Sequence, residues 1–334
     1  MDALVLSQLS YPKMNGIVPG FSGKRTVGWK EIQDHPQYPE MFTDPMYGKM
    51  HRRIFELVAG SRRYACIRAG FYTEWSDEEQ EAQFAAVTFW LGTTSIFVSF
   101  RGTDETLVGW KEDFNMGYMR AVPSQRRALA YLKGVGRYTE GRIILGGHSK
   151  GGNLAIYASA NAPEALQRRI RRIYSFDGPG FRKGFYERRG FHRVEDRYCK
   201  IVPEQSLVGM LLVNYKRYRV VRSYRSGVIQ HDLMQWKIHN GKFVYRKDVY
   251  RRSSRKTEIL NAWVSSLSRA QITEFVGTLY ELLRSTQIKT VYDLMKAPLR
   301  KLYTICRCFA GLDERRRKSF IQTVKKLFQV IVHI

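Results

Sequence analysis

A serine set between glycines is the residue of this chain best placed to do chemistry. The segment 143–155 reads IILGGHSKGGNLA, so Ser149 has Gly147 two residues before it and Gly151 two residues after it. In a Gly-x-Ser-x-Gly turn from strand to helix the serine backbone is strained, and bulky side chains at the flanking positions would clash. The pattern predicts that Ser149 is a nucleophile for acyl transfer at a helix N-terminus. The alternative is a glycine-rich strand-to-helix turn without chemistry.

A nucleophilic serine needs a general base, and the chain has seven histidines. In α/β hydrolases the acid and then the histidine follow the serine along the chain. Four histidines precede the serine or lie in the elbow or in the last predicted helix: His35, His51, His333 and His148, whose side chain should point away from the serine hydroxyl and pack structurally. His231 follows a late strand in a loop and is the predicted base, with His239 and His192 as alternatives.

Two carboxylates stand at the ends of strands that follow the elbow. Asp177 comes directly after the predicted strand 173–176 and is followed by a glycine turn, which favours it as the acid of the triad. Glu204, near the end of the next strand, is the reserve, because either strand end can supply this residue. Asp232 is too close in sequence to His231 to be an easy partner. Asp177 as a carboxylate that merely caps a turn is the plainer alternative.

An oxyanion hole needs two donors beside the nucleophile. The backbone N–H of Lys150 follows from the elbow itself, and the second donor should come from the loop after the third strand. That loop reads Arg-Gly-Thr at residues 101–103, so Thr103 is the predicted donor. In the expected mechanism His231 removes the Ser149 proton, Asp177 holds its tautomer, and water later releases the acyl group.

Strands and helices alternate along the chain, as they must if the predicted site residues are to lie at the ends of parallel strands. Strand patterns occur at residues 63–72, 84–91, 95–100, 198–202 and 218–221, and a hairpin is predicted around residues 240–241. A helix is predicted from residue 123 to about 137, between the third strand and the elbow strand. The fold class expected is α/β, an α/β-hydrolase fold with a mostly parallel sheet.

The hydrophobic period changes from two to 3.6 near residue 253. Ser268 and Gln271 form a predicted capping box, and two apolar stripes follow at helical spacing. We therefore expect an α/β-hydrolase domain over residues 1–250 and a helical C-terminal extension over residues 251–334, packed on it. Apolar stripes of this kind are typical of helices that pack in a core or form a docking surface.

The composition is that of a globular protein with a strong positive charge. The 334 residues are 44% hydrophobic and carry a formal net charge of +26. Such a charge indicates an anionic partner, and peripheral contact with an anionic membrane surface fits it. A solvated basic face without a dedicated ligand is the alternative. Four scattered cysteines predict reduced thiols in a cytoplasmic protein. The charge adds the expectation of a peripheral position at the inner membrane surface. No cofactor, metal site or specific nucleic acid is expected.

Several motifs together resemble known families. The run VSFRGT at residues 98–103, the downstream Trp110 and Asp113, and the elbow look like the fungal-type triacylglycerol lipases. The chain resembles more closely a bacterial family of Mbeg-like α/β hydrolases, whose hallmarks stand here as LSQLSY, GHSKGGNLA, SFDGPGF, SLVGMLL and QHD. The resemblance covers nearly the whole chain. It implies a hydrolase fold and favours Ser149 and His231 as site residues.

One departure from the lipases affects the choice of acid. Their acid lies in an Asp-x-Val-Pro segment, whereas the matching residues 200–203 here read Lys-Ile-Val-Pro. The departure favours Asp177. Lys150 also replaces an apolar residue of the lipases. The expected activity is hydrolysis of an acyl ester, a small molecule or a lipid. The alternatives are a catalytically weak hydrolase fold that serves as a binding or scaffold protein for anionic membranes, and a binder of anionic polymers.

Overall fold

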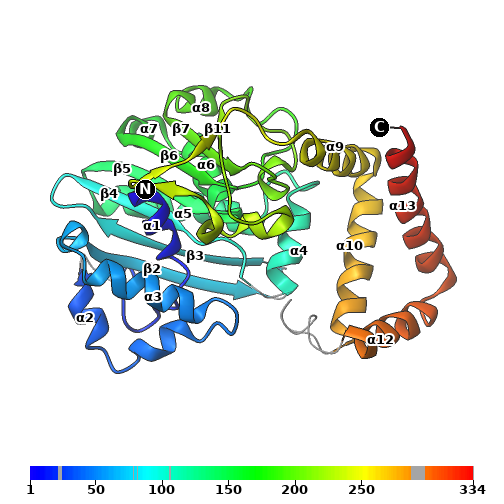
Figure 1. Ribbon diagram of the computed structural model, residues 1–334, viewed down its shortest axis with the longest axis horizontal. Helices are drawn as coiled ribbons and strands as arrows, with labels where there is room; N and C mark the ends of the chain where they lie inside the picture. Colours follow the sequence, from blue (N-terminus) through cyan, green and yellow to red (C-terminus); the bar gives the residue numbers. More distant parts are fainter. Residues whose placement is uncertain (22–24, 78, 81, 105–106, 287–297, 334) are drawn as a thin grey trace.

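A sheet of nine strands forms the centre of the described part of the protein. The computed structural model describes residues 1–21, 25–77, 79–80, 82–104, 107–286 and 298–333. The strands of the sheet, in spatial order, are β1 (Val27–Gly28), β2 (Arg68–Asp77), β3 (Ala82–Trp90), β4 (Ser95–Phe100), β5 (Arg142–His148), β6 (Ile170–Phe176), β7 (Tyr198–Pro203), β8 (Tyr218–Val221) and β11 (Tyr245–Arg246). The strands from β4 to β8 are parallel, and both edges of the sheet are antiparallel. The architecture is an α/β-hydrolase fold (Figure 1).

Helices cover both faces of this sheet, which gives three layers. One face packs against α1 (Asp2–Gln8), α2 (Trp29–Gln33) and α3 (Gly48–Ala59) in one apolar cluster. The other face packs mainly against α5 (Pro123–Tyr138) and α6 (Lys150–Asn161), with α4 (Leu107–Asn115), α7 (Glu164–Arg169) and α8 (Arg189–His192) around them. Six of the eleven buried residues of α6 are glycine, alanine or serine, and these small side chains allow the helix after the elbow to lie close to the strands.

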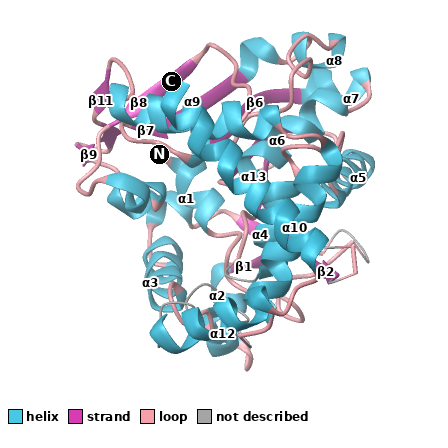
Figure 2. Ribbon diagram, turned by 90° about the vertical axis from the view of Figure 1, so that its right-hand side faces the viewer, coloured by secondary structure: helices cyan, strands magenta, loops and turns pink. Residues whose placement is uncertain are grey.

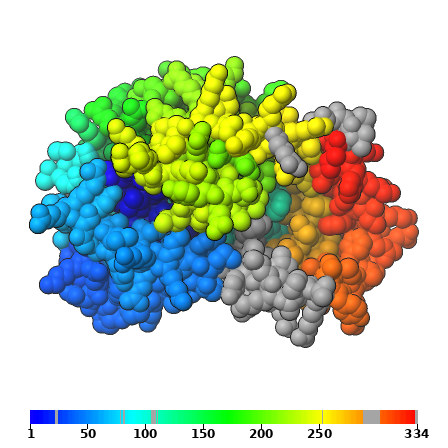
Figure 3. All heavy atoms as spheres, viewed as in Figure 1, coloured from blue at the N-terminus to red at the C-terminus, as the bar shows by residue number. Residues whose placement is uncertain are grey.

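Among the described residues, four helices follow the sheet and stand to one side of it. They are α9 (Arg251–Ser266), α10 (Arg269–Arg284), α12 (Pro298–Ala310) and α13 (Glu314–His333). Figure 1 and Figure 3 show them, in yellow to red, at one end of the molecule, and in Figure 2 α10 and α13 face the viewer. The indole N–H of Trp263 donates to the Thr323 carbonyl at 2.9 Å, which joins α9 to α13.

Contacts of α9 and α10 attach these helices to the rest of the protein. The Asn261 side chain accepts a hydrogen bond from Leu212 N at 2.7 Å, and the Lys111 ammonium lies 4.3 Å from the centre of the Tyr280 ring. The predicted capping box is present, since Ser268 Oγ accepts from Gln271 N. The division into domains at residue 250 remains a prediction. Within the described helices, no segment is both long enough and apolar enough to span a membrane.

One predicted strand is wrong at its start. Residues 95–100 and 218–221 are strands as predicted, but β2 begins at Arg68 instead of residue 63. The Ser61 hydroxyl accepts from Arg63 N and caps a short 3-10 turn, so the chain is not extended there. The hairpin predicted around residues 240–241 forms as β9 (Ile238–His239) and β10 (Lys242–Phe243). The 3-10 segments are η1 (Tyr38–Phe42), η2 (Arg62–Tyr64), η3 (Glu195–Arg197), η4 (Val208–Met210), η5 (Gly227–His231) and η6 (Leu233–Gln235).

Candidate active site

The predicted elbow is a tight turn from β5 to α6. Ser149 lies between them with φ of 55° and ψ of −130°, a conformation that costs a residue with a side chain about 1–3 kcal/mol. A Cβ atom on Gly147 would collide with the backbone of Gly151, and one on Gly151 would collide with the carbonyl group of Phe100. The two flanking glycines are therefore required by the packing of the turn against β4.

Asp177 and His231 meet, although 54 residues separate them. His231 Nδ1 lies 2.7 Å from Asp177 Oδ2, and the carboxylate is buried while the imidazole is 27% exposed. A carboxylate accepts, so Nδ1 carries the proton and Nε2 is left as the basic nitrogen. Ser206 Oγ donates to the other oxygen of the same carboxylate at 2.5 Å. This arrangement fixes both the orientation and the tautomer of the imidazole.

The elbow is hydrogen-bonded to this acid and base pair. Ser149 N donates to the carbonyl group of Phe176, the residue before Asp177, at 2.9 Å. His148 Nε2 lies 2.8 Å from the carbonyl oxygen of His231. The elbow therefore positions the main chain at both predicted partners of the serine. Ser149 is partly exposed, and within the described residues its hydroxyl makes no hydrogen bond.

His148 does more than pack. Because Nε2 faces a carbonyl oxygen it carries the proton, and Nδ1 then accepts from the Tyr11 hydroxyl at 2.9 Å. Burial, followed by the neighbouring His231, places the pKa of His148 well below its ordinary value, so this imidazole is neutral. The rings of His148 and His231 are 4.5 Å apart. Tyr11 is thus linked to the predicted base through one neutral histidine.

The loop after β4 lies against the elbow. A Cβ on Gly102 would stand 3.2 Å from Ser149 Cβ, so the next residue, Thr103, is close to the serine. Thr103 Oγ1 donates to Asp113 Oδ2 at 2.6 Å. Burial raises the pKa of Asp113 to about 6, and its Oδ1 has no hydrogen-bond partner within the described residues. The N–H of Lys150, in the first turn of α6, has no partner within the helix.

The Lys150 side chain points into the protein. Its ammonium lies 2.8 Å from Glu112 Oε2, with 1% and 0% of the two side chains exposed. It also donates to the carbonyl group of Gln83 at 3.3 Å, and Glu112 Oε1 accepts from Ser124 N. This buried ion pair joins the first turn of α6 to α4, the helix that also carries Asp113. The side chain of Trp110, on the same helix, lies outside the described residues.

The alternative residues have other partners. Glu204 accepts from Ser223 N at 3.1 Å and lies 3.5 Å from Arg246. Asp232 caps η6 by accepting from Met234 N. His192 pairs with Glu195 on the surface, and His239 is exposed in the hairpin. Within the described residues none of them contacts His231 through its side chain.

Comparison with known proteins places the chain in a family. A family model described as Mbeg1-like matches residues 58–281, from the end of α3 to α10. The chain belongs to the Mbeg1-like family. No curated protein matches its sequence.

Solved lipase structures are similar to this Mbeg1-like protein at low identity. The M37 lipase is 13% identical, with a TM-score of 0.41 over 62% of this chain and 68% of that one. A Rhizomucor miehei lipase propeptide complex is 14% identical, with a TM-score of 0.35 over 59% and 69%. The lipase of Rhizopus microsporus var. chinensis is 13% identical, with a TM-score of 0.31 over 70% and 87%.

The Mbeg1-like protein carries a buried lysine beside the predicted acid. Lys200 is 1% exposed and donates to the Gly209 carbonyl group at 2.5 Å and to Asn214 Oδ1. A Cβ on Gly209 would collide with Asp177 Oδ1, so this segment packs directly against the carboxylate. Burial lowers the pKa of Lys200 to about 7, and the charge of Asp177 opposes that shift. Lys200 thus holds the segment that supports Asp177.

Sequence reasoning missed the roles of Tyr11, Glu112 and Lys200. Tyr11 ends the motif LSQLSY, and Lys200 stands in the segment where the lipases have their acid, so both positions were marked by the resemblance. Nothing in the sequence near Glu112 indicates its partner, which is 38 residues away. Among the residues that the structure describes, no three His, Cys, Asp or Glu side chains gather as metal ligands would.

Proposed function

We propose that this protein is a serine hydrolase that cleaves acyl esters, lipids among them, through Ser149, His231 and Asp177. One observation carries the proposal: the 2.7 Å contact between His231 Nδ1 and Asp177 Oδ2, in a cluster hydrogen-bonded to the elbow that presents Ser149. A strained serine at a helix N-terminus, next to a histidine oriented by a carboxylate, is the arrangement that acyl transfer needs.

Each residue has a defined step. His231 Nε2 removes the proton of Ser149 Oγ as the oxygen attacks the ester carbonyl carbon, and Asp177 stabilises the imidazolium that forms. The backbone N–H of Lys150 and a donor of Thr103 stabilise the oxyanion. His231 then protonates the leaving alcohol, which leaves an acyl group on Ser149. Water, deprotonated by His231, attacks this acyl-enzyme and releases the carboxylic acid.

We further propose that the protein is cytoplasmic and contacts the anionic inner face of the membrane. Its support is the net charge of +26, because each basic residue near an anionic leaflet contributes about 1 kcal/mol of binding. The four cysteines, all free in the structure, agree with a reducing compartment.

A second function is favoured by one specific observation. The Ser149 hydroxyl makes no hydrogen bond to His231 within the described residues, so the serine is not yet paired with its base. A catalytically weak hydrolase fold that serves as a scaffold on anionic membranes or polymers would have this arrangement together with the basic surface.

Hydrolysis of p-nitrophenyl butyrate, octanoate and palmitate by the purified protein tests the proposed function. We expect a burst of nitrophenol stoichiometric with enzyme and then slower turnover, because acylation and deacylation are separate steps. The Ser149→Ala variant should lose the burst and the turnover. Turnover that persists at the wild-type rate in Ser149→Ala would overturn the proposal, and folded wild-type protein without turnover on any ester would favour the scaffold.

A further inference from the structure

The proposed base lies on a loop that is closed at its foot by two short antiparallel arms. This loop, residues 222–237, follows β8 and is called the histidine loop below; it lies on the face seen in Figure 3, in yellow-green. Ser223 and Trp236 form a β-bridge between the arms, and Lys237 N donates to the Arg222 carbonyl group at 2.8 Å. The two arms hold the loop as one unit at the edge of the site.

The inner side of the histidine loop is packed and hydrogen-bonded. Trp236 is buried, and its indole N–H donates to the Gln230 carbonyl group at 2.9 Å. The Gln230 side chain is buried as well; its Nε2 donates to the Arg225 carbonyl group, and its Oε1 accepts from Gln205 N at 2.9 Å. The loop therefore has a fixed shape and a defined outer side.

Large apolar side chains gather on that outer side, next to the base. Val228, Ile229 and Met234 are 67%, 57% and 47% exposed, and all three lie within three residues of His231. We call these three side chains the apolar tip. Single exposed apolar residues are ordinary on a protein surface, but a group of them on one rigid loop marks a site of interaction.

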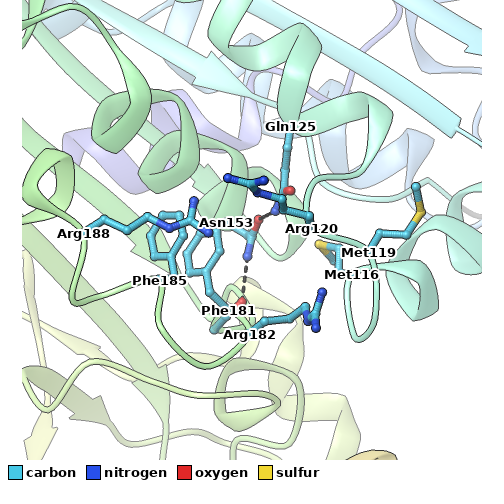
Figure 4. Close-up of a pocket in the computed structure, with 10 residues that line it drawn as sticks. Met116, Met119, Arg120, Gln125, Asn153, Phe181, Arg182, Phe185 and Arg188 are labelled. Carbon is cyan, nitrogen blue, oxygen red and sulfur yellow. Dashed lines mark hydrogen bonds between the residues drawn. The ribbon is translucent and has the colours of Figure 1, made fainter. Parts of the chain in front are cut away.

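The hollow beside α6 offers no comparable surface to an apolar ligand. In Figure 4 Phe181 and Phe185 line this hollow, but the two rings stack with their centres 3.6 Å apart and are only 5% and 3% exposed. The amide of Asn153 there is already bonded, since Nδ2 donates to the Gly180 carbonyl group at 2.8 Å. An apolar ligand can reach the apolar tip and cannot reach these rings.

The positive charge of the chain is concentrated around the same loop. Of the 41 residues from 216 to 256, thirteen are Lys or Arg and two are Asp, so an eighth of the chain supplies a net +11 of the total +26. Within the described part of the chain, Arg222, Arg225 and Lys237 form no ion pair with a carboxylate. Lys237 Nζ lies 5.3 Å from the centre of the exposed Tyr224 ring. Basic side chains around an apolar tip match the chemistry of an anionic bilayer surface.

We propose that the histidine loop docks on an anionic lipid bilayer, with the apolar tip in the interface and the guanidinium groups of Arg222 and Arg225 near the lipid phosphates. An anionic polymer would satisfy the charge but would leave the apolar tip in water. His231, within three residues of the tip, would then lie at the interface, where lipid esters are held. The inference rests on the proposed membrane contact and deepens it by naming the surface that makes it.

Binding to vesicles is measured by sedimentation with the Ser149→Ala protein, so that no lipid is hydrolysed and the result does not depend on activity. The vesicles contain phosphatidylglycerol and phosphatidylcholine in equal parts, and vesicles of phosphatidylcholine alone are the comparison. The tip variant is Val228→Ser with Ile229→Ser. The matched control is Phe328→Ser with Ile331→Ser, which removes side chains 62% and 44% exposed on α13, a basic helix that is the rival surface.

A second pair of variants tests the charge. The charge variant is Arg222→Gln with Arg225→Gln, and its control is Arg171→Gln with Arg172→Gln, which removes two exposed arginines at β6. We expect the tip variant and the charge variant each to bind the anionic vesicles at least about tenfold more weakly, and both controls to stay within about threefold. Vesicles of phosphatidylcholine alone should bind the parent protein much more weakly than the anionic vesicles.

A larger loss in the α13 control than in the tip variant would place the contact on the helical extension and overturn the inference. Equal weakening by the two charge variants, or a tip variant that binds like its parent, would show a diffuse charge effect and overturn it as well. A parent protein that binds no vesicles would overturn both the inference and the proposed membrane contact. Hydrolysis of p-nitrophenyl butyrate by the wild-type protein tests the hydrolase separately, because this ester dissolves in water. Unfolding curves check that all four variants remain folded.

Discussion

The two sides of the candidate site are built differently. On the acid and base side, Asp177, His231 and His148 are linked by short hydrogen bonds, and Asp177 ends a parallel strand of the central sheet. On the side proposed as the oxyanion hole, called the oxyanion side below, Thr103 and Lys150 are held by the carboxylates Asp113 and Glu112 of one helix, α4. The acid and base side works only if the imidazole proton is on the correct nitrogen. The oxyanion side is held in place by buried charged groups. The two sides should therefore respond differently to mutation and to pH.

The largest effect is expected on the acid and base side. Asp177→Asn keeps the shape of the site but lets the amide favour the wrong imidazole tautomer, so kcat should fall about 10⁴-fold. The matched control is Glu204→Gln, whose parent carboxylate pairs with Arg246 and Ser223 and should change kcat by less than about threefold. Steady-state ester hydrolysis measures both. A larger loss of kcat in Glu204→Gln than in Asp177→Asn would show that Glu204, and not Asp177, is the acid of the triad.

The oxyanion side should be more sensitive in stability. Lys150→Met leaves Glu112 charged and buried without its partner, which is expected to cost about 3–5 kcal/mol of unfolding free energy in urea. Lys150→Met combined with Glu112→Leu removes both charges and should recover most of the loss. A double variant no more stable than the single one would show that the ion pair is not the origin of the effect.

Removal of a donor should slow the reaction without unfolding the protein. Thr103→Val eliminates the hydroxyl that donates to Asp113, and with it the fixed position of the loop. Because the Thr103 N–H is then no longer held at the site, we expect kcat to fall by up to about 10²–10³, the range seen when one oxyanion donor is lost. Thr103→Ser keeps the hydroxyl and is the matched control. Equal kcat in the valine and serine variants would contradict a role for this loop.

The pH dependence of stability should distinguish the two sides. Burial raises the pKa of Asp113 from 3.8 to about 6. A carboxyl group with a raised pKa contributes stability fully below its unfolded pKa and loses it as the pH rises through the folded pKa. Asp113→Asn should therefore gain unfolding free energy relative to wild type between pH 4 and pH 6, by on the order of 3 kcal/mol. Urea unfolding across that range checks it, and a constant difference would show that Asp113 does not titrate there.

The smallest effect belongs to the outermost link of the acid and base side. Tyr11→Phe removes the donor to His148 Nδ1 and leaves a buried nitrogen without a partner, which should cost about 1–3 kcal/mol of stability. If Tyr11 positions His231 through His148, the acid limb of the kcat against pH profile shifts as well. Tyr47→Phe, which changes a nearby tyrosine whose ring packs against His51, is the control for this profile. An unchanged profile would mean that Tyr11 is structural.

Sequence reasoning succeeded where the chemistry is local. The strand, turn and helix around Ser149 follow from adjacent residues, and the strand that ends at Asp177 follows from its apolar run and glycine turn. Strand order in a parallel sheet then brings strand ends to one edge, so Asp177 could be placed near the elbow before any coordinates. The same local logic failed at Arg63, where one serine side chain turns the chain out of the strand.

The unpredicted contacts join side chains to partners outside their own secondary-structure element, and two of them join distant segments. Tyr11 meets His148 across 137 residues, Lys150 meets Glu112 across 38, and the Lys200 ammonium reaches the Gly209 carbonyl group from within a strand. A basic residue in a basic chain gives no indication that it will be buried, since most lysines are solvated. Only the packing of α4 and of segment 206–214 against the sheet shows which lysines are buried.

The central claim is that Ser149 is a nucleophile activated by His231. It is tested most directly by labelling the purified protein with a fluorophosphonate probe and locating the adduct by peptide mass spectrometry. We expect rapid labelling of wild type at Ser149, none in Ser149→Ala, and strongly slowed labelling in His231→Ala, with the His239→Ala variant labelled like wild type. Folded wild-type protein that does not react, or an adduct on another residue, would contradict the account.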